Sequence, residues 1–282
     1  MNIVVVYNVR SGSGSTKSSL AMMMRAAGIS VDEWVAIGDG FEKRLMPHIK
    51  ANKTIAVVGG DGSQRAVAAL VAGTKAVMAP LPGGTLNHFT KDLGVAQDME
   101  QAIERLPTRK AISIDVALVN DIVFVNNSSV GLYSHSLLER EKSEKHLGKW
   151  LAAVRGAFRA LVRFRRYAVT VNGLSMRSPF IFVGNNAYKF QKSLLAERSS
   201  LAGGSLTMFV LRSRSRVGMA RATLLDRFGG RKRTDEFIID HPKSVVIEAK
   251  RPELTVSLDG EVIRLKTPLE YKIQPKSLKV LV

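Results

Sequence analysis

Short apolar runs alternate with amphipathic stretches in the part of the chain before Pro107. The runs with the length of buried strands lie at residues 3–7, 31–37, 54–58 and 76–80. The stretches with helical spacing of their apolar residues lie at 16–27, 41–51, 64–71 and 99–106. Continuous apolar strands that alternate with amphipathic helices are typical of a parallel sheet with helices on both faces. We therefore expect a Rossmann-like α/β domain with a parallel sheet at the N-terminus.

After Pro107 the pattern changes to short strand-like runs that are separated by turn signals. These runs lie at residues 112–119, 122–125, 168–171, 179–183, 206–211, 236–240, 244–248 and 253–258. They predict a mostly β domain, either a sandwich or a barrel, that is interrupted by one basic helix over 147–163. A last strand-like run at 278–282 could return to the first domain. We accordingly expect an α/β domain over 1–110, joined by the returning strand at 277–282, and a β domain over 111–276.

Two glycine-rich turns follow two of the expected strands, at the sheet edge where parallel sheets bind ligands. Residues 59–63 read Gly-Gly-Asp-Gly-Ser, and residues 82–87 read Pro-Gly-Gly-Thr-Leu-Asn. Glycine has no Cβ, so its backbone N–H can approach a phosphate closely, and the positive end of a following helix points at the anion. The two turns together predict a nucleotide phosphate site. Within them, Asp61 could hold or orient a metal ion, and Thr85 could either cap a helix or contact a phosphate.

The loop after the first strand is a less specific signal. Asn8 and the Ser-Gly-Ser-Gly run at 11–14 could form a flexible connection or a further phosphate contact. The dinucleotide motif would need a glycine where Lys17 stands, and the P-loop motif would need one where Thr16 stands. This loop therefore supports the phosphate site only in combination with the other two turns.

An acidic turn, Asp259-Gly260-Glu261, lies between two strand-like runs of the second domain. Asp-Gly is a common β-hairpin turn signal, which gives one interpretation. In the other, Glu261 is a general base that takes a proton from an attacking hydroxyl, and Asp259 orients it or helps to hold a metal. The residues alone leave both interpretations open.

The chain is strongly basic, with 42 Lys and Arg against 24 Asp and Glu and a formal net charge of +18. Such a field attracts phosphates, anionic lipid surfaces or nucleic acid. Aromatic residues do not interleave with the basic clusters, so we do not expect a nucleic-acid partner. The helix at 147–163 and a cluster at 212–233 carry much of the charge and predict contact with an anionic membrane, the alternative being a solvated surface.

The absence of cysteine excludes disulfides, thiolate metal sites and cysteine nucleophiles. The five histidines show no metal-ligand spacing. The N-terminus lacks the basic flank of a signal peptide, and no apolar run is long enough to cross a bilayer. We therefore expect a cytoplasmic protein whose membrane contact is peripheral.

The motifs at 59–63, 82–87 and 259–261, and their order along the chain, resemble the catalytic domain of diacylglycerol kinases and their bacterial lipid-kinase relatives. Residues 8–14 resemble the family's first phosphate loop, 124–131 its inter-domain segment, and 183–186 a later segment. The likeness covers nearly the whole chain. NAD kinases are more distant relatives with a similar glycine–aspartate motif.

The resemblance implies ATP with Mg²⁺ bound between an α/β domain and a β-sandwich domain, which presents the acceptor hydroxyl of a lipid. It implies that Glu261 accepts the proton, and we expect Asp259 and Asp61 to act beside it. Ser63 replaces the family's usual threonine, and Gly203 stands where many bacterial members carry an aspartate that helps to bind an accessory structural magnesium. The residues that we expect to bind the nucleotide are Asn8, Ser11, Gly12, Gly59, Gly60, Asp61, Gly62, Ser63, Gln64, Gly84, Thr85 and Asn87.

Two other functions stay open. One is an NAD kinase-like enzyme with a soluble acceptor, and the other is a basic nucleic-acid or membrane-binding module with a decayed kinase site. The sequence does not identify the acceptor lipid, and it leaves the oligomeric state open, a homodimer included.

Overall fold

A computed structural model describes the chain except for residues 9–15, 132–166, 172, 191–195 and 212–236. The described chain divides into two compact units. The first unit consists of Met1–Val116, Ile122–Asn126 and Gln274–Val282. The second unit consists of Ala117–Asp121 and Asn127–Ile273. The chain thus passes between the units at four places, of which one is the peptide bond between Asn126 and Asn127.

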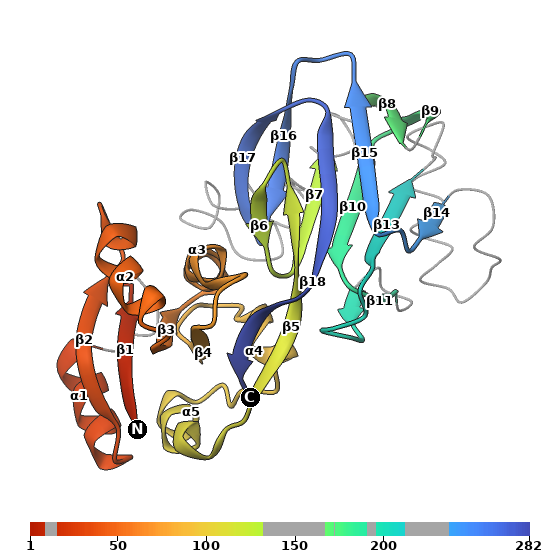
Figure 1. Cartoon of the computed structure of the whole chain (residues 1–282). Coiled ribbons are helices and arrows are strands. Elements are labelled where there is room, and N and C mark those ends of the chain that lie inside the picture. Colours follow the sequence, from red (N-terminus) through yellow and green to blue (C-terminus); the bar gives the residue numbers. More distant parts are fainter. Residues whose placement is uncertain (9–15, 132–166, 172, 191–195, 212–236) are drawn as a thin grey trace, which may run out of the picture. The chain divides into compact units, whose positions relative to one another are not determined.

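The first unit is built on a parallel sheet (Figure 1). Its N-terminal strands are β1 (Asn2–Tyr7), β2 (Ser30–Ala36), β3 (Thr54–Gly59) and β4 (Val77–Pro82). They follow the order β2-β1-β3-β4 and continue with the end of β18 (Leu269–Leu281), whose Val280 pairs with Met78 in parallel. Burial explains the continuous apolar runs, because β1 has four and β3 has five consecutive buried residues.

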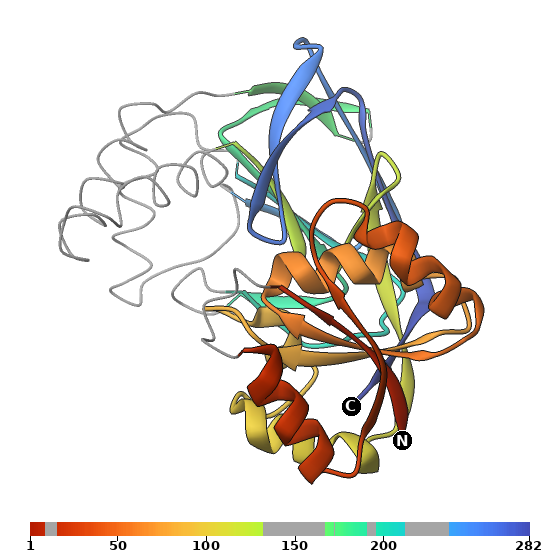
Figure 2. The ribbon, with the colours of Figure 1, turned by 90° about the vertical axis from the view of Figure 1, so that its left-hand side faces the viewer.

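Helices cover both faces of this sheet (Figure 2). They are α1 (Lys17–Ala26), α2 (Phe41–Lys50), α3 (Asp61–Val71), α4 (His88–Asp92) and α5 (Met99–Glu104), followed by a 3₁₀ turn at Leu106–Thr108. Helices α1 and α5 contact each other on one face, and α2 and α3 on the other. The predicted parallel α/β arrangement is confirmed. Helix α3 begins three residues before the predicted start at Gln64, because Gly60 occupies its N-cap position.

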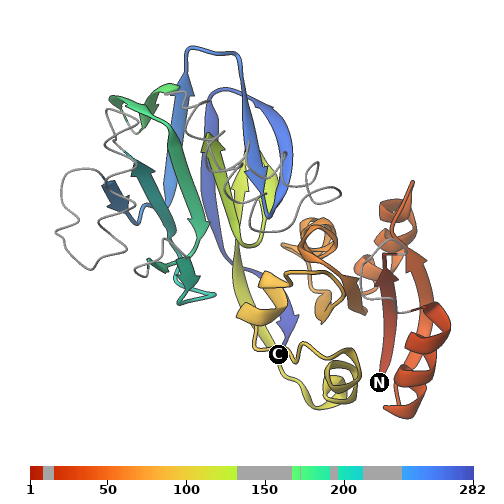
Figure 3. The same ribbon diagram turned by 180° about the vertical axis from the view of Figure 1, so that it is seen from behind.

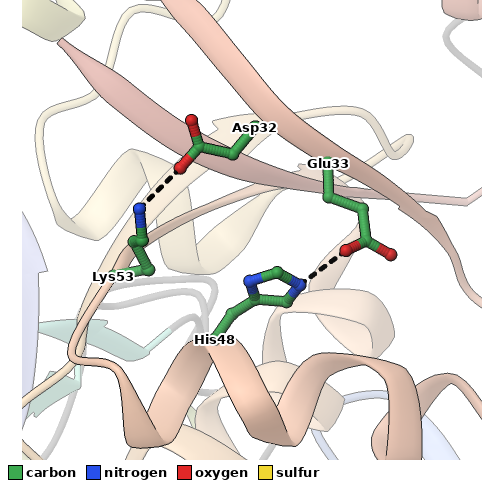
Figure 4. Close-up of polar contacts among 4 residues, drawn as sticks. All are labelled: Asp32, Glu33, His48 and Lys53. Atoms are coloured by element: carbon green, nitrogen blue, oxygen red, sulfur yellow. Dashed lines mark hydrogen bonds and ion pairs between the residues drawn. The ribbon is translucent and has the colours of Figure 1, made fainter.

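Two polar contacts, one ion pair and one histidine–carboxylate hydrogen bond, tie the edge strand β2 to its neighbours (Figure 4). Lys53 Nζ lies 2.8 Å from Asp32 Oδ2, and His48 Nε2 of α2 lies 2.7 Å from Glu33 Oε2. These side chains are partly exposed, so each pair contributes about 0–1 kcal/mol to stability. These contacts have a structural role at the edge of the sheet.

The second unit is built from antiparallel strands (Figures 1 and 3). A six-stranded sheet has the order β14-β13-β10-β7-β16-β17. Its strands are β14 (Phe237–Asp240), β13 (Leu206–Leu211), β10 (Phe180–Asn185), β7 (Asn127–Gly131), β16 (Glu253–Leu258) and β17 (Glu261–Lys266). A second layer joins the start of β18 to β15 (Ser244–Ala249), β8 (Tyr167–Val171) and β9 (Leu174–Ser178). A small hairpin pairs β11 (Tyr188–Phe190) with β12 (Ala196–Arg198).

The core of the second unit lies where its two sheets face each other. Tyr271 of β18 is fully buried, and its hydroxyl lies 3.0 Å from Ser128 Oγ of β7. Burial raises the pKa of the Tyr271 phenol well above its usual range. Among the described strands, the second layer is the antiparallel part of a ten-stranded sheet that continues into the first unit, and the six-stranded sheet is distinct from it, which favours a sandwich over a barrel.

Two strands run through both units. These are β5 (Ala111–Val119), which also pairs with β6 (Ile122–Phe124), and β18. The end of β18, residues Gln274–Val282, belongs to the first unit. Within the described part of the chain, no helix combines the length and the apolar character that a bilayer span requires.

Candidate active site

The parallel register brings three strand ends to one edge of the first sheet. Tyr7 of β1 pairs with Val58 of β3, and Gly59 of β3 pairs with Pro82 of β4. The segments that follow these strands, beginning at Asn8, Gly60 and Gly83, therefore lie side by side. The sequence predicted this arrangement from the order of strands and turns.

The two glycine turns pack backbone against backbone. A Cβ on Gly83 would lie 2.7 Å from the Gly59 nitrogen, and a Cβ on Gly84 would lie 2.5 Å from the Gly60 Cα. A Cβ on Gly59 would meet Ser63 Cβ at 2.5 Å. None of these four glycines has a positive φ. Close approach of the chain to itself, and not a left-handed backbone, is thus what requires glycine here.

Helix α3 starts directly from the first turn with free backbone donors. The N–H groups of Asp61, Gly62 and Ser63 have no acceptor within the helix, as in any first helical turn. Gly60 at the N-cap has no side chain to satisfy them. Ser63 is buried, and its hydroxyl accepts a long hydrogen bond of 3.4 Å from Asn8 Nδ2. The positive end of α3, with these donors, is suited to an anion such as a phosphate.

The Asp61 carboxylate connects this turn to the second one. Its Oδ2 accepts from His88 N at 3.1 Å, and its Oδ1 accepts from Phe89 N at 2.9 Å. Its Oδ1 also accepts from Asn126 Nδ2 at 3.4 Å. A carboxylate that takes two backbone N–H groups at the start of α4 acts as a helix cap from a distant turn.

Thr85 does not cap α4, which was one of its two interpretations. Asn87 occupies the N-cap position, with φ 53° and no side-chain capping bond. Asn87 Oδ1 instead accepts from Gly84 N at 2.8 Å and holds the second turn closed. Thr85 itself is exposed beside Leu86. Its hydroxyl is therefore accessible from outside the protein.

Gln64 has a structural task that the sequence did not reveal. Its side chain is buried, and Nε2 donates to the carbonyls of Val57 at 3.0 Å, Gly59 at 3.1 Å and Leu81 at 2.9 Å. These carbonyls belong to the ends of β3 and β4. We expected Gln64 among the nucleotide ligands, but its amide donors point to the protein backbone. The side chain clamps the two strand ends that carry the turns.

The acidic turn forms a β-hairpin in the second unit. Leu258 pairs with Glu261, and the two residues between them, Asp259 and Gly260, have φ values of 48° and 89°. This matches the type I′ turn that Asp-Gly favours. Asp259 is buried, accepts from Asn127 N through Oδ1 at 3.0 Å, and donates its N–H to Asn127 O at 2.9 Å. Glu261 is exposed at the start of β17. The hairpin interpretation is confirmed, and the role of Glu261 as a base stays a prediction.

Metal binding was expected near Asp61. Within the described ranges, no group of three or more His, Cys, Asp or Glu side chains could hold a metal ion. Mg²⁺ in phosphate-transfer sites commonly uses only one or two carboxylates together with substrate phosphates. Asp61 accepts a single hydrogen bond on Oδ2. It therefore fits a single contact to a phosphate-bound magnesium, but not a complete protein cage.

Gly203 offers no ligand side chain for the accessory magnesium that the sequence left in doubt. Gly203 carries no carboxylate, and its N–H donates to Asn186 Oδ1 at 2.7 Å. A Cβ at this glycine would already lie 3.1 Å from the same oxygen. An N–H donor thus takes the nearby oxygen that a cation would need.

Several predicted features lie outside the described residues. These are Ser11 and Gly12 of the first loop, the basic helix at 147–163 and the basic cluster at 212–233. In the other direction, sequence reasoning missed Asn126. It treated this residue only as part of the segment 124–131, although a polar residue directly after an apolar strand-like run is a signal that the sequence offers; the structure shows that Asn126 is buried.

Comparison with known proteins agrees with the geometry of the glycine turns. Residues 2–119 match the family model of the diacylglycerol kinase catalytic domain. This range contains both turns. The predicted resemblance to the diacylglycerol kinase catalytic domain is confirmed over these residues.

Two curated proteins similar to this chain are both described as a putative lipid kinase. The protein from Staphylococcus epidermidis (strain ATCC 12228 / FDA PCI 1200) is 27% identical over 246 residues, covering 80% of this chain and 75% of the relative. The protein from Staphylococcus haemolyticus (strain JCSC1435) is 23% identical over 313 residues, covering 97% and 91%.

A solved structure has the same fold. It is described as a diacylglycerol kinase from Bacillus anthracis str. Sterne, and it covers 99% of this chain and 96% of its own with a TM-score of 0.71. The sequence identity is 18%, so the likeness concerns the fold.

Proposed function

We propose that this protein is an ATP-dependent lipid kinase, which transfers the γ-phosphoryl group of ATP to a lipid hydroxyl. The observation that carries the proposal is the close packing of the two glycine turns beside the start of α3, which has no side-chain cap. A Cβ added to Gly83 or Gly84 would lie only 2.5–2.8 Å from backbone atoms of Gly59 or Gly60. Such a start offers backbone N–H donors and a positive dipole to phosphate oxygens. The family match over residues 2–119 supports a kinase in particular.

The phosphates of ATP would lie against the first turn of α3. The donors are the N–H groups of Gly62 and Ser63, with the exposed Thr85 hydroxyl reaching from the second turn. Mg²⁺ bound with the nucleotide would neutralise charge on the phosphoryl group that is transferred. Asp61 is the residue that would hold it.

Glu261 would act as general base, with Asp259 orienting the turn that carries it. The lipid hydroxyl loses its proton to the Glu261 carboxylate as its oxygen bonds to the γ-phosphorus. The bond from that phosphorus to the ADP oxygen breaks, and ADP leaves. Positioning and charge neutralisation supply most of the acceleration in phosphoryl transfer, and a base adds on the order of 10²–10⁴-fold.

The acceptor would reach the enzyme at a membrane. The net charge of +18 favours an anionic surface, where each nearby Lys or Arg contributes about 1 kcal/mol. We therefore propose a peripheral membrane protein. Diacylglycerol, a sphingoid base, ceramide and phosphatidylglycerol all offer a hydroxyl, and the assay below distinguishes them.

The test is incubation of the whole protein with labelled ATP·Mg²⁺ and a mixed lipid extract, with the product identified by mass. Parallel reactions contain NAD as the acceptor. A phosphorylated lipid supports the proposal, whereas phosphorylated NAD, or turnover of neither, refutes it.

Glu261→Gln separates the base from the nucleotide site. It should abolish transfer and leave ATP affinity unchanged, because the amide cannot accept the proton. Glu253→Gln is the matched control, since Glu253 is an exposed glutamate in the same hairpin. Full activity of Glu261→Gln would remove Glu261 as the base.

A further inference from the structure

Asn126 is the last residue of a segment of the first unit, and Asn127 is the first residue of the next segment, in the second unit. Each forms hydrogen bonds within its own unit. Asn126 is 3% exposed at the end of its segment in the first unit. Its side chain donates from Nδ2 to Asp61 Oδ1 at 3.4 Å. Asn127 begins β7 in the second unit.

The first anchor bears on the phosphate turns. Asp61 Oδ1 accepts from Phe89 N as well as from Asn126, and Oδ2 accepts from His88 N. The carboxylate must keep one orientation to reach both backbone donors of α4. A buried donor on Oδ1 restricts the rotation of the carboxylate and so fixes that orientation.

The second anchor bears on the acidic turn. Asn127 and Asp259 exchange two hydrogen bonds, from Asn127 N to Asp259 Oδ1 at 3.0 Å and from Asp259 N to Asn127 O at 2.9 Å. Asp259 is the first residue of the hairpin turn that leads to Glu261. A displacement of the Asn127 backbone would therefore move the start of this turn.

We propose that Asn126 is a positioning residue for the phosphate turns. We further propose that the Asn126–Asn127 peptide transmits a displacement of these turns to the acidic turn. Asn126 acts through Asp61, whose orientation it fixes. The peptide bond then carries any movement of Asn126 to Asn127, which is bonded to Asp259. The part that concerns the nucleotide rests on the proposed function, whereas the part that concerns Asp61 does not.

The first experiment measures amide hydrogen exchange in the ligand-free, full-length protein. Asn126→Ala should speed exchange of the His88 and Phe89 amides by about twofold, because the lost hydrogen bond is long, at 3.4 Å, and lies at the weak end of net hydrogen-bond strength. Asn2→Ala is the matched control, because Asn2 is an exposed asparagine of the same unit and its φ is not positive. Unchanged exchange at both amides in Asn126→Ala overturns the proposal without reference to any ligand.

The second experiment is a double-mutant cycle on the dissociation constant for ATP·Mg²⁺. If Asn126 acts through Asp61, then Asn126→Ala and Asp61→Asn should be non-additive, the double variant being close to Asp61→Asn alone. A general folding defect would instead give additive losses, which overturns the proposal. Wild-type protein that binds no ATP refutes the proposed function, while the exchange experiment still decides the role of Asn126.

The third measurement tests transmission. Saturating ATP·Mg²⁺ should slow exchange of the Asn127 and Asp259 amides in the wild type, and Asn126→Ala should lose this slowing. If Asn126→Ala does not fold, Asn126→Ser replaces it, because a hydroxyl keeps the polarity but is too short to reach Asp61. Equal slowing in wild type and variant overturns the transmission.

Discussion

Replacing Gly84 with alanine tests whether the two glycine turns really form one packed unit. The new Cβ would lie 2.5 Å from the Gly60 Cα and 3.1 Å from Asn87 Oδ1. Non-bonded carbon atoms prefer separations of about 3.5–4.0 Å, so the turns must separate by roughly 1 Å. Gly84 has no positive φ, which means that alanine meets a steric conflict here and no backbone strain.

The cost follows from that displacement. Forcing atoms into a packed region typically costs about 1–3 kcal/mol, and the nearest atom in conflict, Gly60 Cα, belongs to the backbone and cannot rotate away. Hydrogen bonds to phosphate need about 2.7–3.2 Å, so a shift of roughly 1 Å removes them. We expect Gly84→Ala to weaken ATP·Mg²⁺ binding by about 10- to 100-fold and to lower the unfolding temperature by several degrees.

Calorimetric titration with ATP·Mg²⁺ and thermal unfolding provide the two measurements. Gly38→Ala is the matched control, because nothing lies within 4 Å of its added Cβ and its φ is not positive. That change should leave binding intact and raise stability by up to about 1 kcal/mol through the unfolded state. Wild-type affinity and wild-type unfolding temperature in Gly84→Ala would refute the packing argument.

Three further changes probe other parts of the molecule. Gln64→Leu removes the donor to three buried carbonyls and should cost about 2–4 kcal/mol in urea unfolding, so a loss below 1 kcal/mol would contradict the clamp. A chelator should leave the unfolding temperature of the ligand-free protein unchanged, because the Gly203 loop is closed by a hydrogen bond to Asn186; a drop would reveal a structural metal. Tyr271 has a raised pKa in the folded state, so its contribution is complete below the pKa of the unfolded phenol, near 10, and is lost as the pH rises further. Tyr271→Phe should therefore flatten the fall in stability above about pH 10, and an unchanged slope would argue against burial of the phenol.

Most elements of the first unit could be predicted because their burial is regular. The central positions of strands β1 and β3 are covered on both faces, so Ile3–Val6 and Ile55–Val58 are all apolar and the runs stand out. Helix α4 was missed because five residues show no periodicity, and its cap comes from Asp61, 27 residues earlier. Periodicity is a local signal and cannot detect a helix whose stabilising contact is distant.

The second unit was harder for a different reason. Strand β7 reads Asn-Ser-Ser-Val-Gly, which resembles a loop, yet Ser128 and Ser129 are buried in the centre of the six-stranded sheet. Buried polar side chains contradict the composition rule on which strand prediction depends. The partner that accounts for Ser128 is Tyr271, 143 residues later. Such pairings exist only in the folded chain.

For the glycine turns, the sequence predicted where the turns lie but gave only part of the reason why glycine is required there. Glycines next to a strand end indicated a phosphate site, since a phosphate must approach the backbone. The structure adds that Gly83 and Gly84 are required by Gly59 and Gly60, whose backbone they touch. The same residues therefore serve the packing of the protein before any ligand arrives.

This double requirement makes the two turns a single element in both folding and binding. Asp61 belongs to the first turn but caps the helix that follows the second, and Gln64 donates to the strands that lead into each. A change in either turn must then displace the other, because backbone contacts leave no flexible side chain to absorb it. The N–H donors of the first turn of α3 are held in place largely by backbone packing between the two turns, so affinity for phosphate should follow the integrity of this packing more closely than the identity of any one ligand residue.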